Sequence, residues 1–159
     1  MEPRLNFYKS GPEAMKAMTT LEQQIARSGL DKSLVELVRL RASQINGCAY
    51  CIDMHWKDLV AIGEKEQRLY SLDAWRESPY YSERERAALH WTEAVTSIEK
   101  EHVPDSVYEA VRSHFNEKEL ADLTLAVATI NSWNRLSIAA RLTPGTYQPT
   151  PSNNKSTNA

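Results

Sequence analysis

Residues 31–63 contain two helices and the turn that joins them, and they read DKSLVELVRLRASQINGCAYCIDMHWKDLVAIG. Asp31 is a favourable N-cap for the first helix, which we expect over about 32–46, and Gly47 follows its last residue. Apolar residues cover a broad face of this helix, which indicates a helix packed on several sides. A second helix is expected over about 48–62, directly after the turn.

The segments outside this stretch also carry helix signals, and no window shows the sustained alternation of a β-strand. Two sequences have the form of a capping box, and they begin at Ser10 and Ser82. Asn116, with Glu119 three residues on, is expected to cap the last helix. Further helices are therefore expected over about 10–28, 65–72, 83–99, 104–115 and 117–141. The sequence predicts an all-α helical bundle of about seven helices in a single domain.

Composition excludes several classes of protein. The chain has 159 residues, of which 42% are hydrophobic and 25% charged, as is typical of one globular domain. The formal net charge of −2 lacks the basic excess of a nucleic-acid binder, so no nucleic-acid partner is expected. No apolar run approaches the roughly 18 residues of a membrane helix, and residues 1–10 lack the apolar core of a signal peptide. We therefore expect a cytoplasmic protein that does not bind membranes.

The composition changes near the C-terminus. From Thr143 onward, three prolines occur among Asn, Ser and Thr, and almost no apolar residue follows Tyr147. We expect a helical domain over residues 1–142, followed over 143–159 by a mobile tail or an arm that lies on a neighbouring subunit.

The residues with chemical potential lie between positions 36 and 55. Cys48 and Cys51 are three residues apart at the start of a helix, close enough to close into a disulfide that reopens readily. The first turn of a helix also stabilises thiolates. His55 lies one turn after Cys51 and can accept its proton, while Glu36 on the preceding helix can orient His55 or relay a proton to it.

Other interpretations of the same residues stay open. Cys48, Cys51, His55 and Glu36 could together supply the roughly four ligands of a zinc site. Glu36 could instead face solvent or pair with Arg39, and His55 could be a structural histidine. Tyr50 and Trp56 are expected to be pocket or core aromatics.

The spacing of Glu36, Cys48, Cys51 and His55 resembles the core of the alkyl hydroperoxidase D family. This family is the redox-active branch of the carboxymuconolactone decarboxylase-like superfamily. The similarity extends over roughly residues 20–141. Its supporting stretches are Gln44–Gly47, Leu69–Glu77, Ser82–Thr96 and Ile130–Arg135.

The resemblance implies an all-helical fold that assembles as a trimer, or as a hexamer of dimers. It also implies reduction of a hydroperoxide by the cysteine pair. We expect this cycle to need no metal, haem, flavin or other cofactor. In some members a lipoyl or thioredoxin-like adaptor serves as the dithiol reductant. The best-studied members carry a His just before the second cysteine, where this chain has Tyr50.

The sequence therefore predicts a thiol-dependent hydroperoxide reductase with an antioxidant role. Cys51 is expected to attack the peroxide, Cys48 to resolve the sulfenic acid, His55 to act as base and Glu36 to relay or orient. One alternative is a thiol–disulfide carrier or redox sensor with little peroxidase activity. The other is a non-catalytic oligomer that holds a metal or a small ligand.

Overall fold

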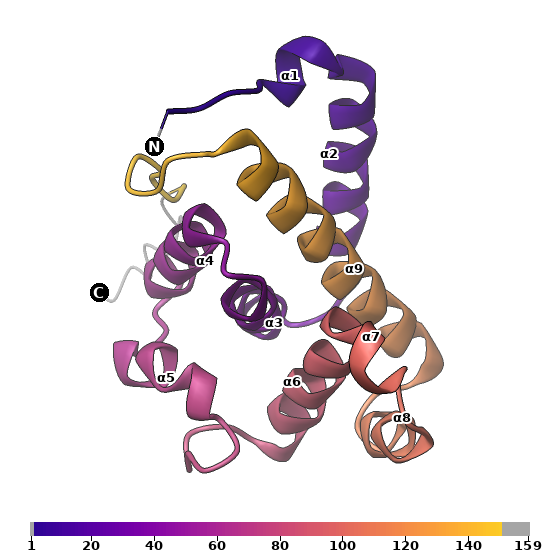
Figure 1. Cartoon of the computed structure of the whole chain (residues 1–159). Helices are drawn as coiled ribbons and strands as arrows, with labels where there is room; N and C mark the ends of the chain where they lie inside the picture. Colours follow the sequence, from indigo (N-terminus) through magenta and orange to yellow (C-terminus); the bar gives the residue numbers. More distant parts are fainter. Residues whose placement is uncertain (1, 151–159) are drawn as a thin grey trace, which may run out of the picture.

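The computed structural model of the chain describes residues 2–150, which form nine α-helices, one 3₁₀ helix and no β-strand (Figure 1). The helices are α1 (Phe7–Ser10), α2 (Pro12–Ala26), α3 (Lys32–Asn46), α4 (Ala49–Ala61), α5 (Glu66–Tyr70), η1 (Leu72–Ala74), α6 (Glu83–Thr96), α7 (Ile98–Glu101), α8 (Asp105–Arg112) and α9 (Glu117–Ala140). The predicted all-α class is confirmed. The two α-helices beyond the expected seven are the four-residue helices α1 and α7.

Helix α3 lies at the centre of the bundle, where Figure 1 shows it nearly end-on with α4, α6 and α9 around it. Its side chains enter three separate apolar clusters. Val38 packs with α6, α8 and α9, Leu37 and Leu40 pack with α4 and α5, and Val35 packs with Ile25 of α2. Full burial of one such side chain contributes roughly 1.5–3 kcal/mol, so the broad apolar face of α3 anchors the whole fold.

Most of the predicted helix ends are formed as expected. Asp31, Ser82 and Asn116 each accept a backbone N–H at the start of their helix, and the last two form complete capping boxes. Gly47 ends α3 in the left-handed conformation, with φ of 67°, which a residue without Cβ adopts at little cost. This turn fixes the direction in which α4 leaves α3.

The capping box predicted at Ser10 is wrong. Helix α2 begins at Pro12, its N-cap is Gly11, and no side chain caps it. Ser10 is instead the last residue of α1, because Asn6 accepts the N–H of Lys9 and starts a helical turn earlier in the chain.

Three helices are shorter than predicted. The helix expected over 83–99 breaks at Ser97, whose φ of −103° and ψ of 43° are not helical, so α6 and α7 are separate. The helix expected over 65–72 divides into α5 and η1 at Ser71. Helix α8 follows Pro104 but ends at Arg112 rather than at residue 115.

The chain after α9 turns back along α4 (yellow in Figure 1). The Gly145 N–H donates to Asp53 Oδ2 at 3.0 Å, and the Lys57 ammonium donates to the Tyr147 carbonyl oxygen at 3.1 Å. The first residues of the predicted tail therefore contact this chain's own domain, and residues 151–159 lie outside the described residues. Within the described part of the chain, no helix is long and apolar enough to cross a bilayer.

Candidate active site

The turn between α3 and α4 places both cysteines at the N-terminus of α4. Cys48 is the N-cap, in an extended conformation, and its sulfur accepts the Cys51 N–H at 3.4 Å. The two residues form a disulfide with their Cα atoms 5.3 Å apart, within the usual range for a bridge. Each residue is only 1% exposed. The predicted pairing of Cys48 with Cys51 is therefore present, and the disulfide is buried.

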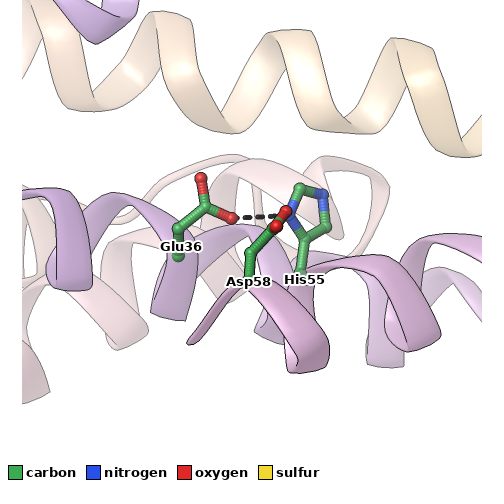
Figure 2. Close-up of side chains that lie close together, drawn as sticks. All are labelled: Glu36, His55 and Asp58. Atoms are coloured by element: carbon green, nitrogen blue, oxygen red, sulfur yellow. Dashed lines mark hydrogen bonds and ion pairs between the residues drawn. The ribbon is translucent and has the colours of Figure 1, made fainter. Parts of the chain in front are cut away.

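Glu36 of α3 and His55 of α4 form a buried pair (Figure 2), and both line the same cavity as Cys51. Nδ1 of His55 lies 2.7 Å from Oε2 of Glu36, and Arg39 donates to Oε1 of Glu36, also at 2.7 Å. Burial alone would raise the pKa of Glu36, but the hydrogen bond and charge of His55, together with Arg39, outweigh burial and lower it to about 2. Glu36 therefore does not face solvent, and it pairs with both Arg39 and His55.

This geometry fixes which nitrogen of His55 carries the hydrogen. An ionised carboxylate only accepts hydrogen bonds, so Nδ1 must donate to Glu36, and in the neutral ring Nε2 holds a lone pair. Nε2 is buried and has no hydrogen-bond partner within residues 2–150. The imidazole thus presents a free basic atom one helical turn after Cys51.

Residues from α2 and α9 hold this pair in place. Arg39 makes a second ion pair, with Glu22 of α2. The indole N–H of Trp133 on α9 donates to Glu22 Oε1 at 2.9 Å. Glu36, the carboxylate that orients His55, is therefore connected through Arg39 and Glu22 to α2 and α9. These two helices lie outside the segment that contains Glu36, the cysteines and His55.

A cavity of about 300 Å³ opens onto this cluster. Its wall includes Cys51 and His55 but not Cys48. A second cavity, of about 520 Å³, shares Tyr50 and Trp133 with the first. Tyr50 is therefore a pocket aromatic. Trp56 packs against the apolar cluster of α4 and α5. Both placements fall within the prediction that these residues are pocket or core aromatics.

Asp58 is a site residue that the sequence analysis missed. It lies on α4 three residues after His55, and the carboxylate oxygens of Glu36 and Asp58 and a ring nitrogen of His55 all lie within 4.8 Å of one another (Figure 2). The hydroxyl of Tyr147 donates to Asp58 Oδ1 at 2.7 Å. The spacing from His55 could have indicated Asp58, whereas Tyr147 carries no local signal because it is 89 residues away.

The arrangement suits an ion-pair relay better than a metal site. Ligand atoms around a tetrahedral zinc ion lie roughly 3.3 Å or more apart, given bonds of about 2.0–2.2 Å. The Glu36–His55 distance of 2.7 Å is that of a hydrogen bond, and Arg39 occupies the other carboxylate oxygen. Because Cys48 and Cys51 are joined to each other, neither offers the thiolate that a zinc site would need.

A buried amide network secures the end of α3 just before the cysteines. Asn46 donates to Asn134 Oδ1 at 2.8 Å, and Asn134 donates to the Ser43 hydroxyl at 3.0 Å. Asn134 is fully buried on α9. This network fastens the last turn of α3 to α9 and so sets the position from which the chain enters Cys48.

Comparisons with known proteins identify the family of the chain. Residues 12–94 match the carboxymuconolactone decarboxylase family, and the chain belongs to this family as an AhpD-like member. It is 46% identical over 139 residues to the uncharacterized protein YdfG of Bacillus subtilis, a match that covers 87% of this chain and 95% of YdfG. It is also 54% identical over 39 residues to the alkyl hydroperoxide reductase AhpD of Rhodopseudomonas palustris, which is 24% of this chain and 22% of AhpD.

A solved structure shows the same fold. A protein of unknown function from Agrobacterium tumefaciens, whose description suggests an AhpD antioxidant defence protein, superposes with a TM-score of 0.88 at 42% identity. The match covers 92% of this chain and all of that one. The predicted AhpD-like fold is therefore confirmed.

Proposed function

We propose that the chain is a thiol-dependent hydroperoxide reductase. The observation that carries this proposal is the meeting of Cys51 and His55 in one cavity, where Glu36 fixes the ring and leaves Nε2 free. A paired thiol, a base within one helical turn and an orienting carboxylate are the parts of an activated nucleophile. The likeness to a short stretch of AhpD supports the same chemistry.

The proposed cycle has three balanced steps. The Cys51 thiolate attacks one oxygen of the hydroperoxide and breaks the O–O bond, which gives a sulfenic acid and, after one proton is added, an alcohol. The Cys48 thiol then condenses with the sulfenic acid, so that the disulfide forms and water leaves. An external dithiol, of the lipoyl or thioredoxin-like type, reduces the disulfide by thiol exchange and is itself oxidised.

His55 moves the proton in the first step. Its Nε2 takes the proton of the Cys51 thiol, and the imidazolium then gives it to the departing oxygen. The Glu36 carboxylate stabilises the imidazolium while the charge exists. Because the cavity reaches Cys51 and not Cys48, we assign attack on the peroxide to Cys51 and resolution to Cys48.

The cavity favours an organic hydroperoxide over hydrogen peroxide. Several of its wall side chains are large and apolar or aromatic, among them Tyr50, Met54, Ile130 and Trp133. The adjoining cavity of about 520 Å³ continues this lining with Leu5, Phe7 and Leu136. Apolar walls of this extent contribute binding energy to a hydrocarbon group, whereas hydrogen peroxide has no apolar surface to bury.

The proposal is tested by peroxide consumption with dithiothreitol as reductant and cumene hydroperoxide as substrate. Wild type should turn over, and Cys51→Ser should lose activity by at least about 1,000-fold. Cys48→Ser, reduced, freed of dithiothreitol and then treated with the hydroperoxide, should accumulate a sulfenic acid on Cys51. A sulfenic acid found on Cys48 alone, in the Cys51→Ser protein, would reverse the assignment. Rapid dithiol exchange without peroxide consumption would support a thiol–disulfide carrier, the alternative that Tyr50 favours.

We also propose that the chain forms a trimer or a hexamer. Large apolar side chains are exposed on α7, α8 and α9 and just after α9, and exposed apolar surface of this kind marks interfaces. They are Ile98, Tyr108, Leu125, Ile138 and Leu142. Light scattering at micromolar concentration measures the assembly directly, and a stable monomer would contradict it.

A further inference from the structure

We propose that Asp58, held by Tyr147 of the segment after α9, is a positioning residue that stabilises the charged form of His55. The C-terminal segment would thereby act on the redox site without contacting either cysteine. The inference deepens the proposed function, since it rests on His55 being the base for Cys51. It adds two residues, Asp58 and Tyr147, to a relay that otherwise consists of Glu36 and His55.

Geometry supports the role of Asp58. It follows His55 by three residues on α4, so the two side chains share one face of the helix. The carboxylate of Asp58 joins that of Glu36 within 4.8 Å of a ring nitrogen of His55 (Figure 2). The ring of His55 therefore has two carboxylates beside it, and among residues 2–150 only Glu36 makes a direct hydrogen bond to it.

Tyr147 is placed for this contact by several interactions. Its hydroxyl donates to Asp58 Oδ1 at 2.7 Å, and its carbonyl oxygen accepts the Lys57 ammonium at 3.1 Å. Two residues earlier, the Gly145 N–H donates to Asp53 Oδ2 at 3.0 Å. Gly145 has φ of +98°, a backbone conformation that residues with a Cβ atom rarely adopt. The turn before Tyr147 is thus built to bring this segment onto α4.

The charges around Asp58 show what the contact does. Burial raises the pKa of Asp58, and the hydrogen bond from Tyr147 opposes that rise by stabilising the carboxylate. The negative Glu36 raises the pKa of Asp58 further, while positive His55 and Lys32 lower it. Burial and the nearby Asp58 raise the pKa of Tyr147 far above its ordinary value, so its hydroxyl remains a donor.

Besides Glu36, the side chains of α2 and α3 that line the cavity include one cation, Arg39, and one anion, Glu22. Arg39 of α3 binds the far oxygen of Glu36, and Glu22 of α2 is bound to Arg39 in turn. Helix α9 presents Trp133 and Ser137 to the cavity, and neither carries charge. An ionised Asp58 therefore adds a second negative charge beside His55 and favours the imidazolium that forms when Nε2 takes the Cys51 proton.

The test compares Asp58→Asn and Tyr147→Phe with wild type in the full-length, reduced protein. Two quantities are measured against pH: the NMR titration of the His55 ring and the alkylation of Cys51 by iodoacetamide, resolved by peptide mass spectrometry. In Asp58→Asn the midpoint of the His55 titration should fall by about one pH unit, the order expected for a nearby charge partly screened by water. The midpoint of Cys51 alkylation should rise by a similar amount.

Tyr147→Phe should move both midpoints in the same directions by less than half as much, because Asp58 keeps its charge over part of the range. Matched controls are Asp73→Asn and Tyr70→Phe, since the Asp73 side chain is 73% exposed and Tyr70 is 72% exposed. Neither control should move either midpoint. Both substitutions at the site are nearly isosteric, and thermal unfolding reports whether each variant is folded.

Each outcome decides one part of the proposal. An unchanged His55 titration in Asp58→Asn would overturn it. An unchanged titration in Tyr147→Phe alone would overturn the part assigned to the C-terminal segment. A shifted His55 titration with unchanged Cys51 alkylation would support Asp58 as the partner of His55 and show that His55 is not the base for Cys51.

Discussion

Two partly buried charge clusters flank α3, and one of them lines the same cavity as Cys51. Arg39 and Arg41 are two residues apart, so they leave opposite sides of the helix. Each arginine binds a carboxylate that also accepts an indole N–H: Glu22 with Trp133 on one side, and Glu93 on the other. Each cluster also lines a cavity of about 300 Å³ or 270 Å³.

In the cluster of Arg41, the carboxylate of Glu93 is bound by three side chains of the same cluster. Glu93 accepts from Arg41 at 2.8 Å and from the indole N–H of Trp75 at 2.8 Å, and it also binds Arg76. His90 packs against Trp75 with ring centroids 6.4 Å apart. Burial and the positive charge of Arg76 lower the pKa of His90, which disfavours its charged form.

The difference shows what makes a buried ion-pair cluster chemically useful. Around Arg39, a carboxylate holds one nitrogen of a histidine and leaves the other nitrogen free beside a disulfide. Around Arg41, the histidine lies near a cation, and the carboxylate is saturated by three donors. A cavity lined by partly buried charges is therefore common to both sides of α3, and the orientation of the histidine separates a candidate site from a structural cluster.

The largest effect that tests this comparison is on rate. His55→Ala should slow oxidation of Cys51 in a single turnover by about 10²- to 10⁴-fold at neutral pH, the usual loss when a proton-transfer group is removed. The rate should recover in part as the pH approaches about 9, where an unassisted thiol ionises. His90→Ala should leave the rate within about twofold. A pH profile of His55→Ala that overlays the wild-type profile would make both histidines structural.

The second effect is on how the free energy of unfolding depends on pH. Because folding lowers the pKa of Glu36 from 4.5 to about 2, its ionised form stabilises the native state above pH 4.5, and this contribution disappears as the pH falls towards 2. It amounts to on the order of 3 kcal/mol. The difference in free energy of unfolding between wild type and Glu36→Gln, from urea titrations, should therefore shrink over that window.

Glu93→Gln is the matched variant on the other side of α3. Burial would raise the pKa of Glu93, but hydrogen bonds from Trp75, Arg76 and Arg41 lower it, so its contribution has the same sign. Since Glu93 is more exposed to solvent than Glu36, the stability difference should be smaller, and the rate of Cys51 oxidation should not change. A Glu36→Gln difference that stays constant from pH 6 to pH 2 would contradict the ionised buried pair.

Local sequence signals predicted the parts of the fold that local forces determine. The caps at Asp31, Ser82 and Asn116 and the turn at Gly47 depend on neighbours within four residues, and all are formed. The capping box predicted at Ser10 is wrong because Asn6, a few residues earlier, caps a helix that includes Ser10 as its last residue. Competition between two nearby caps cannot be decided from the pattern of either one.

The candidate site divides in the same way. The spacing of Cys48, Cys51 and His55 along α4 follows from helix geometry, and the reversal at Gly47 brings Glu36 across to them. The residues that fasten this group come from segments far along the chain, because Trp133 is 111 residues from Glu22, and Tyr147 is 89 from Asp58. No period or local motif encodes such contacts, since they depend on how α2, α9 and the C-terminal segment pack.

The smallest effect concerns the two indole donors, and it sharpens the comparison most. Trp133→Phe and Trp75→Phe make the same change in size, and each removes one N–H bond to a carboxylate, at 2.9 Å and 2.8 Å. Each should lower the free energy of unfolding by about 1–3 kcal/mol, as for a hydrogen bond to a charged group. Only Trp133→Phe should also slow Cys51 oxidation, by roughly three- to tenfold, because Glu22 then holds Arg39, and through it Glu36, less firmly. Urea unfolding and single-turnover oxidation measure the two quantities. Equal rate losses in both variants would show that packing alone, and not the chain of hydrogen bonds from Trp133 to His55, sets the reactivity of the thiol.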